Sequence, residues 1–264
     1  MKRFTQKIKP FYAWLGMVVL ALVLVLYVPQ PGNAQSSTSL NLRVGTDADY
    51  IPFEYRDTPS SDIVGFDIDI AKYIAAQLDF TFDIHEVPFE QLLPELQAGE
   101  LDFAIAAITP TPSRRVNVDF SIPYFEARHA LISQRTHPVR TSADLSAKRI
   151  AVQQGSFQEQ TLITEVESGA EFTILPLERM NDVVSAVRDG DADVAIAEEL
   201  VAEAYLENNP TLVMDVMGEW DSTPMAIAFP SDSPYVEPFN QVLTEMKNSG
   251  ELYLLAKQWF TADP

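Results

Sequence analysis

The chain has 264 residues, no cysteine and a formal net charge of −20 at pH 7. The lack of cysteine excludes a disulfide framework and a lipid-modified cysteine, and the negative charge argues against a nucleic-acid partner, because its phosphates would be repelled. The length is enough for one large domain or for two lobes with separate cores.

The first predicted element is a secretory signal peptide over residues 1–34. A basic segment precedes an apolar run over residues 11–28, and the small residues Gly32 and Ala34 precede a cleavage site before Gln35. Basic, apolar and small segments in this order are typical of an export signal. An uncleaved membrane anchor is the alternative, since the run has 18 residues and about 20 span a bilayer. Two prolines that follow the run favour cleavage.

The chain after residue 34 is expected to be a soluble periplasmic protein. The first 34 residues contain four of the 18 basic residues and no acidic one, so the rest has 14 basic and 38 acidic residues and a net charge of −24. Such acidity serves solubility and says little about a ligand. No later segment is apolar enough to cross a membrane. No phosphate-binding loop or nucleophile elbow is present, and the histidines lack metal-ligand spacing, so we expect no cofactor and no metal.

Short strands alternate with helices along the rest of the chain. Apolar residues recur every four positions over residues 66–78, as on one face of a helix, and alternate over residues 80–84, as in a strand. Further strands are predicted over residues 40–44, 103–107, 149–153, 172–175 and 194–197, and further helices around residues 92–96, from residue 156, and over residues 180–188. This alternation indicates βαβ units, mainly parallel sheets and an α/β fold.

An internal repeat indicates two similar lobes. Residues 89–106 align without gaps on residues 180–197, and the alignment matches a glycine, an aspartate three residues later and an Ala-Ile-Ala segment. Each copy is typical of an amphipathic helix, a glycine C-cap and a buried strand. Any helix–glycine–strand unit shares part of this pattern, but the matched Gly-x-x-Asp favours related lobes. Because ligands of open α/β sheets bind at the carboxyl ends of the strands, we expect a cleft between two such ends.

Five segments carry ordered motifs. They are L-R-V-G-T-D-A-D-Y-I-P-F-E-Y over residues 42–55, V-G-F-D-I-D-I-A over 64–71, T-P-T-P-S-R over 109–114, V-D-F-S-I-P-Y over 118–124 and Q-G-S over 154–156. Together they resemble the polar amino-acid-binding proteins of bacterial ABC importers, the family 3 extracellular solute-binding proteins with the type II periplasmic binding protein fold. The resemblance extends from about residue 40 to residue 260.

The resemblance implies a fold and a function. The fold is α/β, with two similar lobes joined by a two-strand hinge and the ligand cleft between them. Residues 35–130 and 225–264 would form lobe 1 and residues 131–224 lobe 2, with hinge strands near residues 126–133 and 221–226. The function would be that of a periplasmic substrate-binding component of an ABC amino-acid importer. Such a monomer closes on a polar L-amino acid, basic or amide-bearing, and presents it to an inner-membrane permease without catalysis.

Two other functions remain as alternatives. A few proteins similar in fold dehydrate cyclic acids, as cyclohexadienyl and arogenate dehydratases do, and this reaction needs a general acid beside the leaving group. The sequence has no distinctive acid–base constellation of that kind. A sensory ectodomain would need the apolar run over residues 11–28 to be kept as an anchor.

The α-carboxylate of an amino acid is assigned to Arg114 and to a helix start. Arg114 offers a planar fork that matches a carboxylate. Ser156 is expected to cap a helix, with Glu159 completing a capping box, so that N–H groups near Ser156 and Phe157 add a second clamp. A surface ion pair for Arg114 and a purely structural cap are the alternatives.

The resemblance assigns the ammonium group to Glu198, at the end of the second repeated strand. The family usually has an aspartate there, so Glu198 departs by one methylene, and the neighbouring Glu199 is the alternative. Thr109 is expected to contribute its hydroxyl. Ala106 and Ala107 stand where the family often has serine or glycine, so they would contribute only backbone groups.

Asp47, Tyr50 and Phe89 are expected to shape the pocket for the ligand's side chain. An acid between aromatic faces suits a cationic or amide-bearing side chain, and arginine is the first choice because its flat group also stacks on aromatic rings. Asp47 as a turn residue and Phe89 as a core residue are the alternatives. Asp49 would replace Asp47 if the loop is shifted, and Glu54 would add a second charge.

Overall fold

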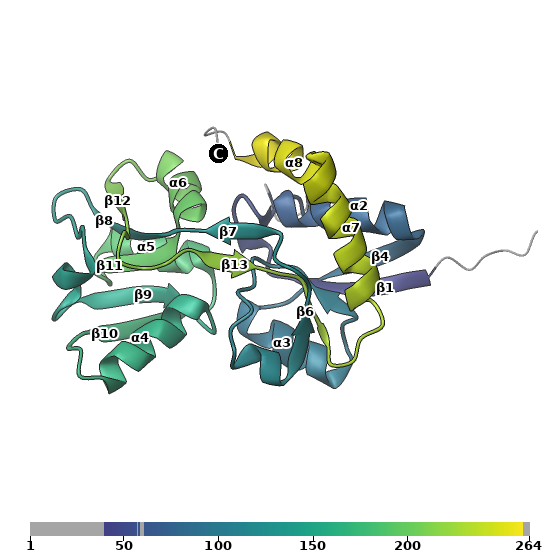
Figure 1. The fold of residues 1–264 in the computed structure, drawn as a ribbon. Helices are drawn as coiled ribbons and strands as arrows, with labels where there is room; N and C mark the ends of the chain where they lie inside the picture. Colours follow the sequence, from purple (N-terminus) through teal and green to yellow (C-terminus); the bar gives the residue numbers. More distant parts are fainter. Residues whose placement is uncertain (1–39, 57, 59–60, 261–264) are drawn as a thin grey trace, which may run out of the picture. The chain divides into compact units, whose positions relative to one another are not determined.

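The computed structural model describes residues 40–56, 58 and 61–260, and the predicted signal peptide lies outside these residues. Two five-stranded sheets with helices on both faces organise the described part of the chain (Figure 1). The first sheet and its helices are called lobe 1 below, and the second sheet and its helices lobe 2. No helix within the described residues has the length and apolar character that a membrane span requires.

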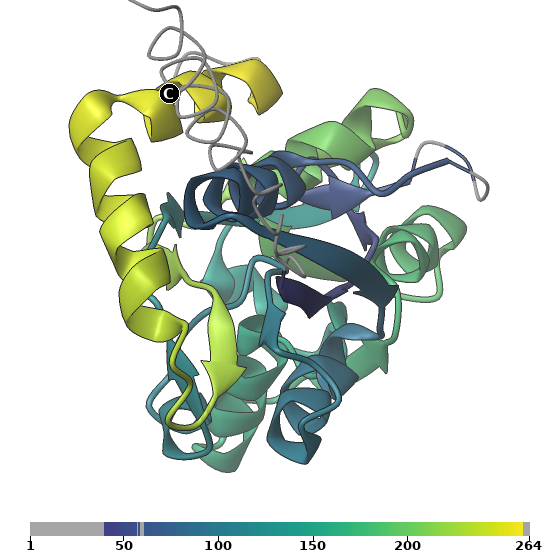
Figure 2. The ribbon, with the colours of Figure 1, turned by 90° about the vertical axis from the view of Figure 1, so that its right-hand side faces the viewer.

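Lobe 1 is built on a sheet with the strand order β4-β1-β5-β14-β6. Its strands are β1 (Leu40–Thr46), β4 (Phe80–Glu86), β5 (Phe103–Ala104), β6 (Val118–Phe120) and β14 (Ala228–Pro230). β1 is parallel to β4 and β5, whereas β14 is antiparallel to both of its neighbours. One face is covered by α2 (Phe66–Leu78), α7 (Val236–Ser249) and α8 (Glu251–Trp259), and the other by α3 (Phe89–Ala98) (Figures 1 and 2).

The alternation of side chains along the strands explains why both faces are covered. Leu42 and Val44 of β1 pack in the hydrophobic cluster that includes residues of α2 and α7, whereas Ala104 of β5 packs with Leu92 and Leu96 of α3. Successive side chains of a strand point to opposite faces, so a strand that is apolar at every position needs helices on both sides. The sequence shows this pattern at residues 103–107.

Lobe 2 repeats the arrangement with the strand order β10-β9-β11-β8-β12. Its strands are β8 (His129–Gln134), β9 (Arg149–Gln153), β10 (Thr173–Leu177), β11 (Val194–Glu198) and β12 (Leu212–Val216). β9 is parallel to β10 and β11, and β8 is antiparallel to both of its neighbours. One face packs against α4 (Phe157–Glu167), and the other against α5 (Met180–Asp189) and α6 (Glu199–Glu207).

The two repeated segments form corresponding units of the two lobes. The helices of these units end at glycines with positive φ (Gly99, 72°; Gly190, 86°). Three residues later, Asp102 accepts hydrogen bonds from the backbone N–H (2.7 Å) and the guanidinium (2.9 Å) of Arg43 in β1. Asp193 accepts the same pair from Arg149 in β9, at 2.8 and 3.0 Å. The repeat in the sequence is therefore a repeat in the structure, and the prediction of two similar α/β lobes is confirmed.

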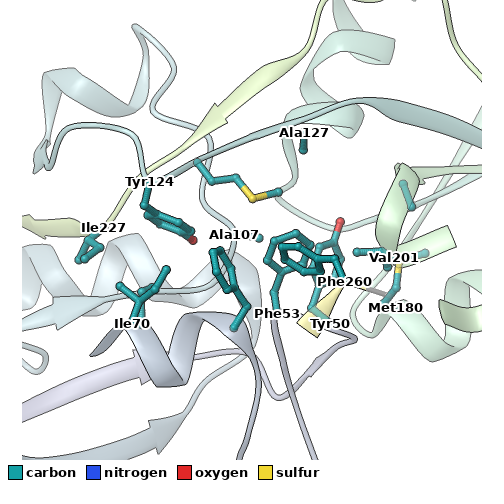
Figure 3. Close-up of a cluster of buried hydrophobic side chains, with 14 of the residues drawn as sticks. Tyr50, Phe53, Ile70, Ala107, Tyr124, Ala127, Met180, Val201, Ile227 and Phe260 are labelled. Atoms are coloured by element: carbon teal, nitrogen blue, oxygen red, sulfur yellow. The ribbon is translucent and has the colours of Figure 1, made fainter. Parts of the chain in front are cut away.

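Two short antiparallel strands connect the lobes. The chain passes into lobe 2 through β7 (Phe125–Ala127) and returns through β13 (Thr223–Met225), and the two strands run side by side between the sheets (Figure 1). Phe53 is fully buried beside these connecting strands, and the centroid of its ring lies 5.6 Å from that of Phe125 and 5.4 Å from that of Phe260. Figure 3 shows Phe53, Tyr50 and Phe260 close together within the buried apolar cluster.

Two details differ from the sequence predictions. The strand predicted over residues 103–107 ends at Ala104, and Ala107 has a φ of 48°, so the chain turns out of the sheet before the predicted strand end. The predicted capping box of α4 is also different: Ser156 caps the helix, but Glu159 accepts its hydrogen bond from Gly155 N at 2.6 Å and not from the N–H of Ser156. The N–H of Ser156 donates to Gln153 O instead.

Candidate ligand-binding site

One cavity between the lobes contains most of the residues singled out in the sequence. Nine of the ten predicted site residues line it, and two further residues, Gln153 and Gln158, complete its wall. The nine are Tyr50, Phe89, Ala106, Ala107, Thr109, Arg114, Ser156, Phe157 and Glu198. The tenth, Asp47, does not line this cavity. Lobe 1 supplies residues 50–114 and lobe 2 residues 153–198, so a molecule in the cavity contacts both lobes.

Arg114 begins the short 3₁₀ helix η1 (Arg114–Val116) and reaches across the cavity. Its Nη1 donates to Thr109 O at 2.7 Å and its Nη2 to Gly155 O of lobe 2 at 2.8 Å. Its guanidinium carbon lies 5.5 Å from the centroid of the Phe89 ring. Burial lowers the pKa of Arg114 to about 10, and the nearby Glu198 opposes the shift, so the side chain stays cationic at neutral pH. A guanidinium has five N–H donors, and these two bonds leave donors for an anion.

The start of α4 forms the lobe 2 wall of the cavity. Ser156 Oγ accepts from Glu159 N at 3.1 Å and fixes the first turn. Phe157 opens the helix, and its ring stacks on His129 at 5.5 Å between centroids. The first N–H groups of an α-helix have no acceptor within the helix, and the helix dipole makes this end positive. A carboxylate in the cavity would be stabilised at this end.

Glu198 ends β11 with only 3% of its surface exposed. It accepts hydrogen bonds from the Tyr50 hydroxyl of lobe 1 and, at 2.9 Å, from Gln158 Nε2 of lobe 2. The rival residue Glu199 points elsewhere and pairs with Arg128 at 2.6 Å outside this cavity. Strand register therefore puts Glu198, and not Glu199, at the cavity. A carboxylate accepts about four hydrogen bonds, so Glu198 can also accept from an ammonium group.

Ala106 and Ala107 form a tight backbone turn beside the cavity. Ala107 N donates to Asp67 Oδ2 at 2.8 Å, so its N–H is engaged by the protein. Asp67 is fully buried and accepts a second hydrogen bond, at 2.7 Å, from the Tyr124 hydroxyl. The carbonyl groups of this turn remain as acceptors that can face a ligand.

Asp47 lies one hydrogen bond behind the cavity wall. The side chain of Gln153 lies between Asp47 and the cavity. Gln153 Nε2 donates to Asp47 Oδ2 at 2.6 Å, and Asp47 is 3% exposed. Asp47 lines an adjoining hollow with Glu86, Glu178 and Arg179. Burial raises the pKa of Asp47 to about 7, the charge of Asp49 adds to this effect and Arg179 opposes it.

The two alternatives to Asp47 have other partners. Asp49 contacts the start of α5 and the hydroxyl of Tyr205. Glu54, 1% exposed, interacts with the buried Asp67. Among the described residues, neither side chain lines the cavity that contains Arg114 and Glu198.

The sequence analysis missed Gln153 and Gln158, although both lie beside the quoted Q-G-S motif. Gln153 is the last residue of β9 and follows the apolar residues 150–152, and a polar residue at the end of a buried strand was the signal that could have indicated it. Gln158 is 3% exposed in the first turn of α4 and donates to Glu198. Within the described residues, no group of three His, Cys, Asp or Glu side chains is arranged to hold a metal ion.

Comparisons with known proteins match this arrangement. Residues 42–262 match the family model of the bacterial extracellular solute-binding proteins, family 3. The arginine-binding extracellular protein ArtP of Bacillus subtilis (strain 168) is 33% identical over 254 residues, which are 95% of this chain and 98% of ArtP.

Two solved structures are also similar. An ancestral arginine-binding protein bound to arginine has a TM-score of 0.77 and 34% identity, with 83% of this chain and 98% of that chain covered. The ancestral amino acid-binding protein AncCDT-1, a precursor of cyclohexadienyl dehydratase, has a TM-score of 0.75 and 30% identity, with 83% and 95% covered. All three proteins are named as binding proteins, which favours binding over the dehydratase alternative.

Proposed function

The chain belongs to family 3 of the bacterial extracellular solute-binding proteins, and from that premise we propose that it binds a basic L-amino acid, with arginine preferred. The observation that carries the proposal is the cavity itself. Arg114 and the buried Glu198 face one space between the lobes, and these opposite charges match the carboxylate and the ammonium of a free amino acid.

The backbone of the ligand would be held by charge-assisted hydrogen bonds. The α-carboxylate would accept from the free donors of Arg114 and from the first N–H groups of α4, near Ser156 and Phe157. The ammonium would donate to Glu198 and to Thr109 or a carbonyl group at Ala106 and Ala107. Bonds of this type are about twice as strong as neutral ones.

The side chain of the ligand would extend along Tyr50 towards Gln153 and Asp47. A guanidinium there would replace or share the Gln153–Asp47 hydrogen bond and pair with the carboxylate. An aliphatic side chain would leave Asp47 unpaired, and an acidic one would be repelled, each at a cost of a few kcal/mol. The names of ArtP and of the ancestral protein bound to arginine support this choice.

The proposal includes the transport role. Residues 1–34 would direct export and be removed, and the protein would act in the periplasm as a monomer that delivers its ligand to an ABC permease. Closure would occur by bending at β7 and β13 between lobe 1 and lobe 2. The family is extracellular by description.

Calorimetric titration with arginine and with citrulline, its neutral isostere, tests the proposed ligand. At pH 8 arginine should bind at least about tenfold more tightly, because only arginine pairs with ionised Asp47. Below the pKa of Asp47, about 7, the carboxyl becomes protonated and the preference should narrow. Asp47→Asn should narrow the preference for arginine over citrulline at both pH values. Tighter binding of leucine or glutamate than of arginine would rule out the assignment of the pocket.

A further inference from the structure

A second group of contacts joins the lobes outside the ligand cavity. Asp49 belongs to β2 (Asp49–Tyr50), a strand that pairs with β3 (Glu54–Tyr55) on lobe 1. Its Oδ2 accepts a hydrogen bond from Asn181 N of lobe 2 at 3.0 Å. The hydroxyl of Tyr205, on α6 of lobe 2, lies 2.9 Å from Asp49 O and 3.2 Å from Asp49 Oδ1. One side chain of lobe 1 therefore contacts two helices of lobe 2.

The contact with Asn181 completes the N-terminus of α5. The residue at the N-cap position of α5 is Arg179, and its side chain makes no capping hydrogen bond. The first N–H groups of a helix need an outside acceptor, and the positive end of the helix dipole favours an anion. Asp49, which belongs to the other lobe, supplies both the acceptor and the negative charge, so the start of α5 is capped only where the lobes meet.

Ion pairs flank this contact. Arg179 Nη2 lies 3.1 Å from Glu86 Oε1 of lobe 1, and Glu86 Oε2 lies 3.1 Å from Arg56 Nε. The side chain of Arg179 is 49% exposed and that of Glu86 35%, so solvent screens the pair and it contributes little. Asp49, held by two groups of lobe 2, is the stronger link.

We propose that Asp49 sets the affinity for the ligand without touching it, by capping α5 across the cleft and so stabilising the arrangement in which both lobes contact the ligand. Asp49 is a positioning residue, in contrast to Asp47 two residues earlier, which faces Gln153 at the cavity wall. The proposal rests on the proposed function, since it needs a ligand that bridges the lobes. A contact between the lobes raises the affinity for every such ligand by the same factor, whatever the ligand's side chain.

The test compares Asp49→Ala with Tyr205→Phe and with the control Asp182→Ala, and arginine and citrulline are the probes. At pH 8, above the pKa of Asp47, Asp49→Ala should weaken the binding of both probes by the same factor of about ten, which corresponds to about 1.4 kcal/mol, the range of a helix cap. Stopped-flow measurements should show a faster dissociation of arginine. The melting temperature without ligand should change little, because the contact joins lobes and does not hold one lobe together. Tyr205→Phe, which removes one hydroxyl, should show a smaller effect of the same kind.

Asp182→Ala is the matched control. Asp182 is an exposed acid in the first turn of α5, so its loss changes the charge beside the helix start without breaking a contact between the lobes. Unchanged affinities in Asp49→Ala would overturn the proposal. A loss of affinity for arginine that citrulline does not share would also overturn it, because Asp49 would then contact the side chain of the ligand. Failure of the wild type to bind either probe would instead reject the proposed function, and it is seen before any variant is measured.

Discussion

The side chain of Arg114 contacts both lobes, and its partners are two backbone carbonyl groups and one aromatic ring. Its bonds to Thr109 O and Gly155 O fix the plane of the guanidinium, and Phe89 supports one of its faces. The partners in lobe 1, Thr109 O and the Phe89 ring, hold the guanidinium in place before the lobes close on a ligand, which reduces the conformational entropy lost on binding. A lysine would keep the charge but lose the planar fork.

Arg114→Ala should abolish measurable binding of arginine and citrulline alike. Losing a desolvated charge partner of the carboxylate costs about 3–5 kcal/mol, a factor of more than a hundred. Arg114→Lys should recover part of the affinity. Arg115→Ala is the control, because Arg115 packs over Phe120 and donates to Pro110 O outside the cavity. Calorimetry that finds near-normal affinity in Arg114→Ala would remove this residue from the site.

At the scale of elements, the repeated helix–glycine–strand unit is fastened by the same arginine–aspartate pair in each lobe. Each aspartate accepts from a backbone N–H and from a guanidinium, and these bonds lower the pKa of Asp102 and of Asp193 against the opposing effect of burial. The side chain of Asp102 is 25% exposed and that of Asp193 36%. The pair in lobe 1 is therefore less screened by solvent.

Asp102→Ala should lower the free energy of unfolding by about 1–2 kcal/mol, because three charge-assisted hydrogen bonds to Arg43 of β1 are lost. Asp193→Ala should cost less, since its pair is more exposed. Urea denaturation followed by circular dichroism measures both, with Asp191→Ala as a control for the charge of the same turn. A negligible decrease in the free energy of unfolding in both variants would show that the arginine–aspartate pair does not stabilise either lobe.

The elements and much of the site follow from local sequence, and the contacts between distant segments do not. Helix α2 and the position of Ser156 at a helix start depend on spacing within about a dozen residues, so the sequence was sufficient. Gln153 and Asp47 are separated by 106 positions, and Asp49 and Asn181 by 132. The sequence around one of these residues does not indicate its partner, and only the folded structure shows that the two residues are in contact.

At the scale of the whole molecule, a buried pair of carboxyl groups links the cleft to the core of lobe 1. Asp67 Oδ2 accepts from Ala107 N and from the Tyr124 hydroxyl. Asp67 Oδ1 and Glu54 Oε2 are buried, and neither accepts a hydrogen bond from a donor among the described residues. Burial and the charge of Asp67 both favour the protonated form of Glu54, and a protonated carboxyl can donate a hydrogen bond to a neighbouring carboxylate.

Burial raises the pKa of Asp67 to about 7 from its ordinary 3.8, and burial together with the charge of Asp67 raises the pKa of Glu54 well above its ordinary value. Between these ordinary and raised values, the folded protein binds more protons than the unfolded chain. Stability is therefore full below about pH 4 for these groups and falls as the pH rises through 7, by up to about 1.4 kcal/mol per pH unit for each group.

The melting temperature of the protein without ligand should accordingly be higher at pH 5 than at pH 8. Glu54→Gln should flatten this dependence and retain stability at pH 8, because a neutral amide can donate to Asp67 as the protonated carboxyl does. Glu245→Gln, at an exposed position of α7, controls for the loss of one negative charge and should leave the slope unchanged. Thermal unfolding across this range compares the three proteins. If Glu54→Gln keeps the full wild-type slope, the pH dependence arises from the raised pKa of the buried Asp47 and from repulsion among the acidic residues, and the pair of Glu54 and Asp67 is not its source.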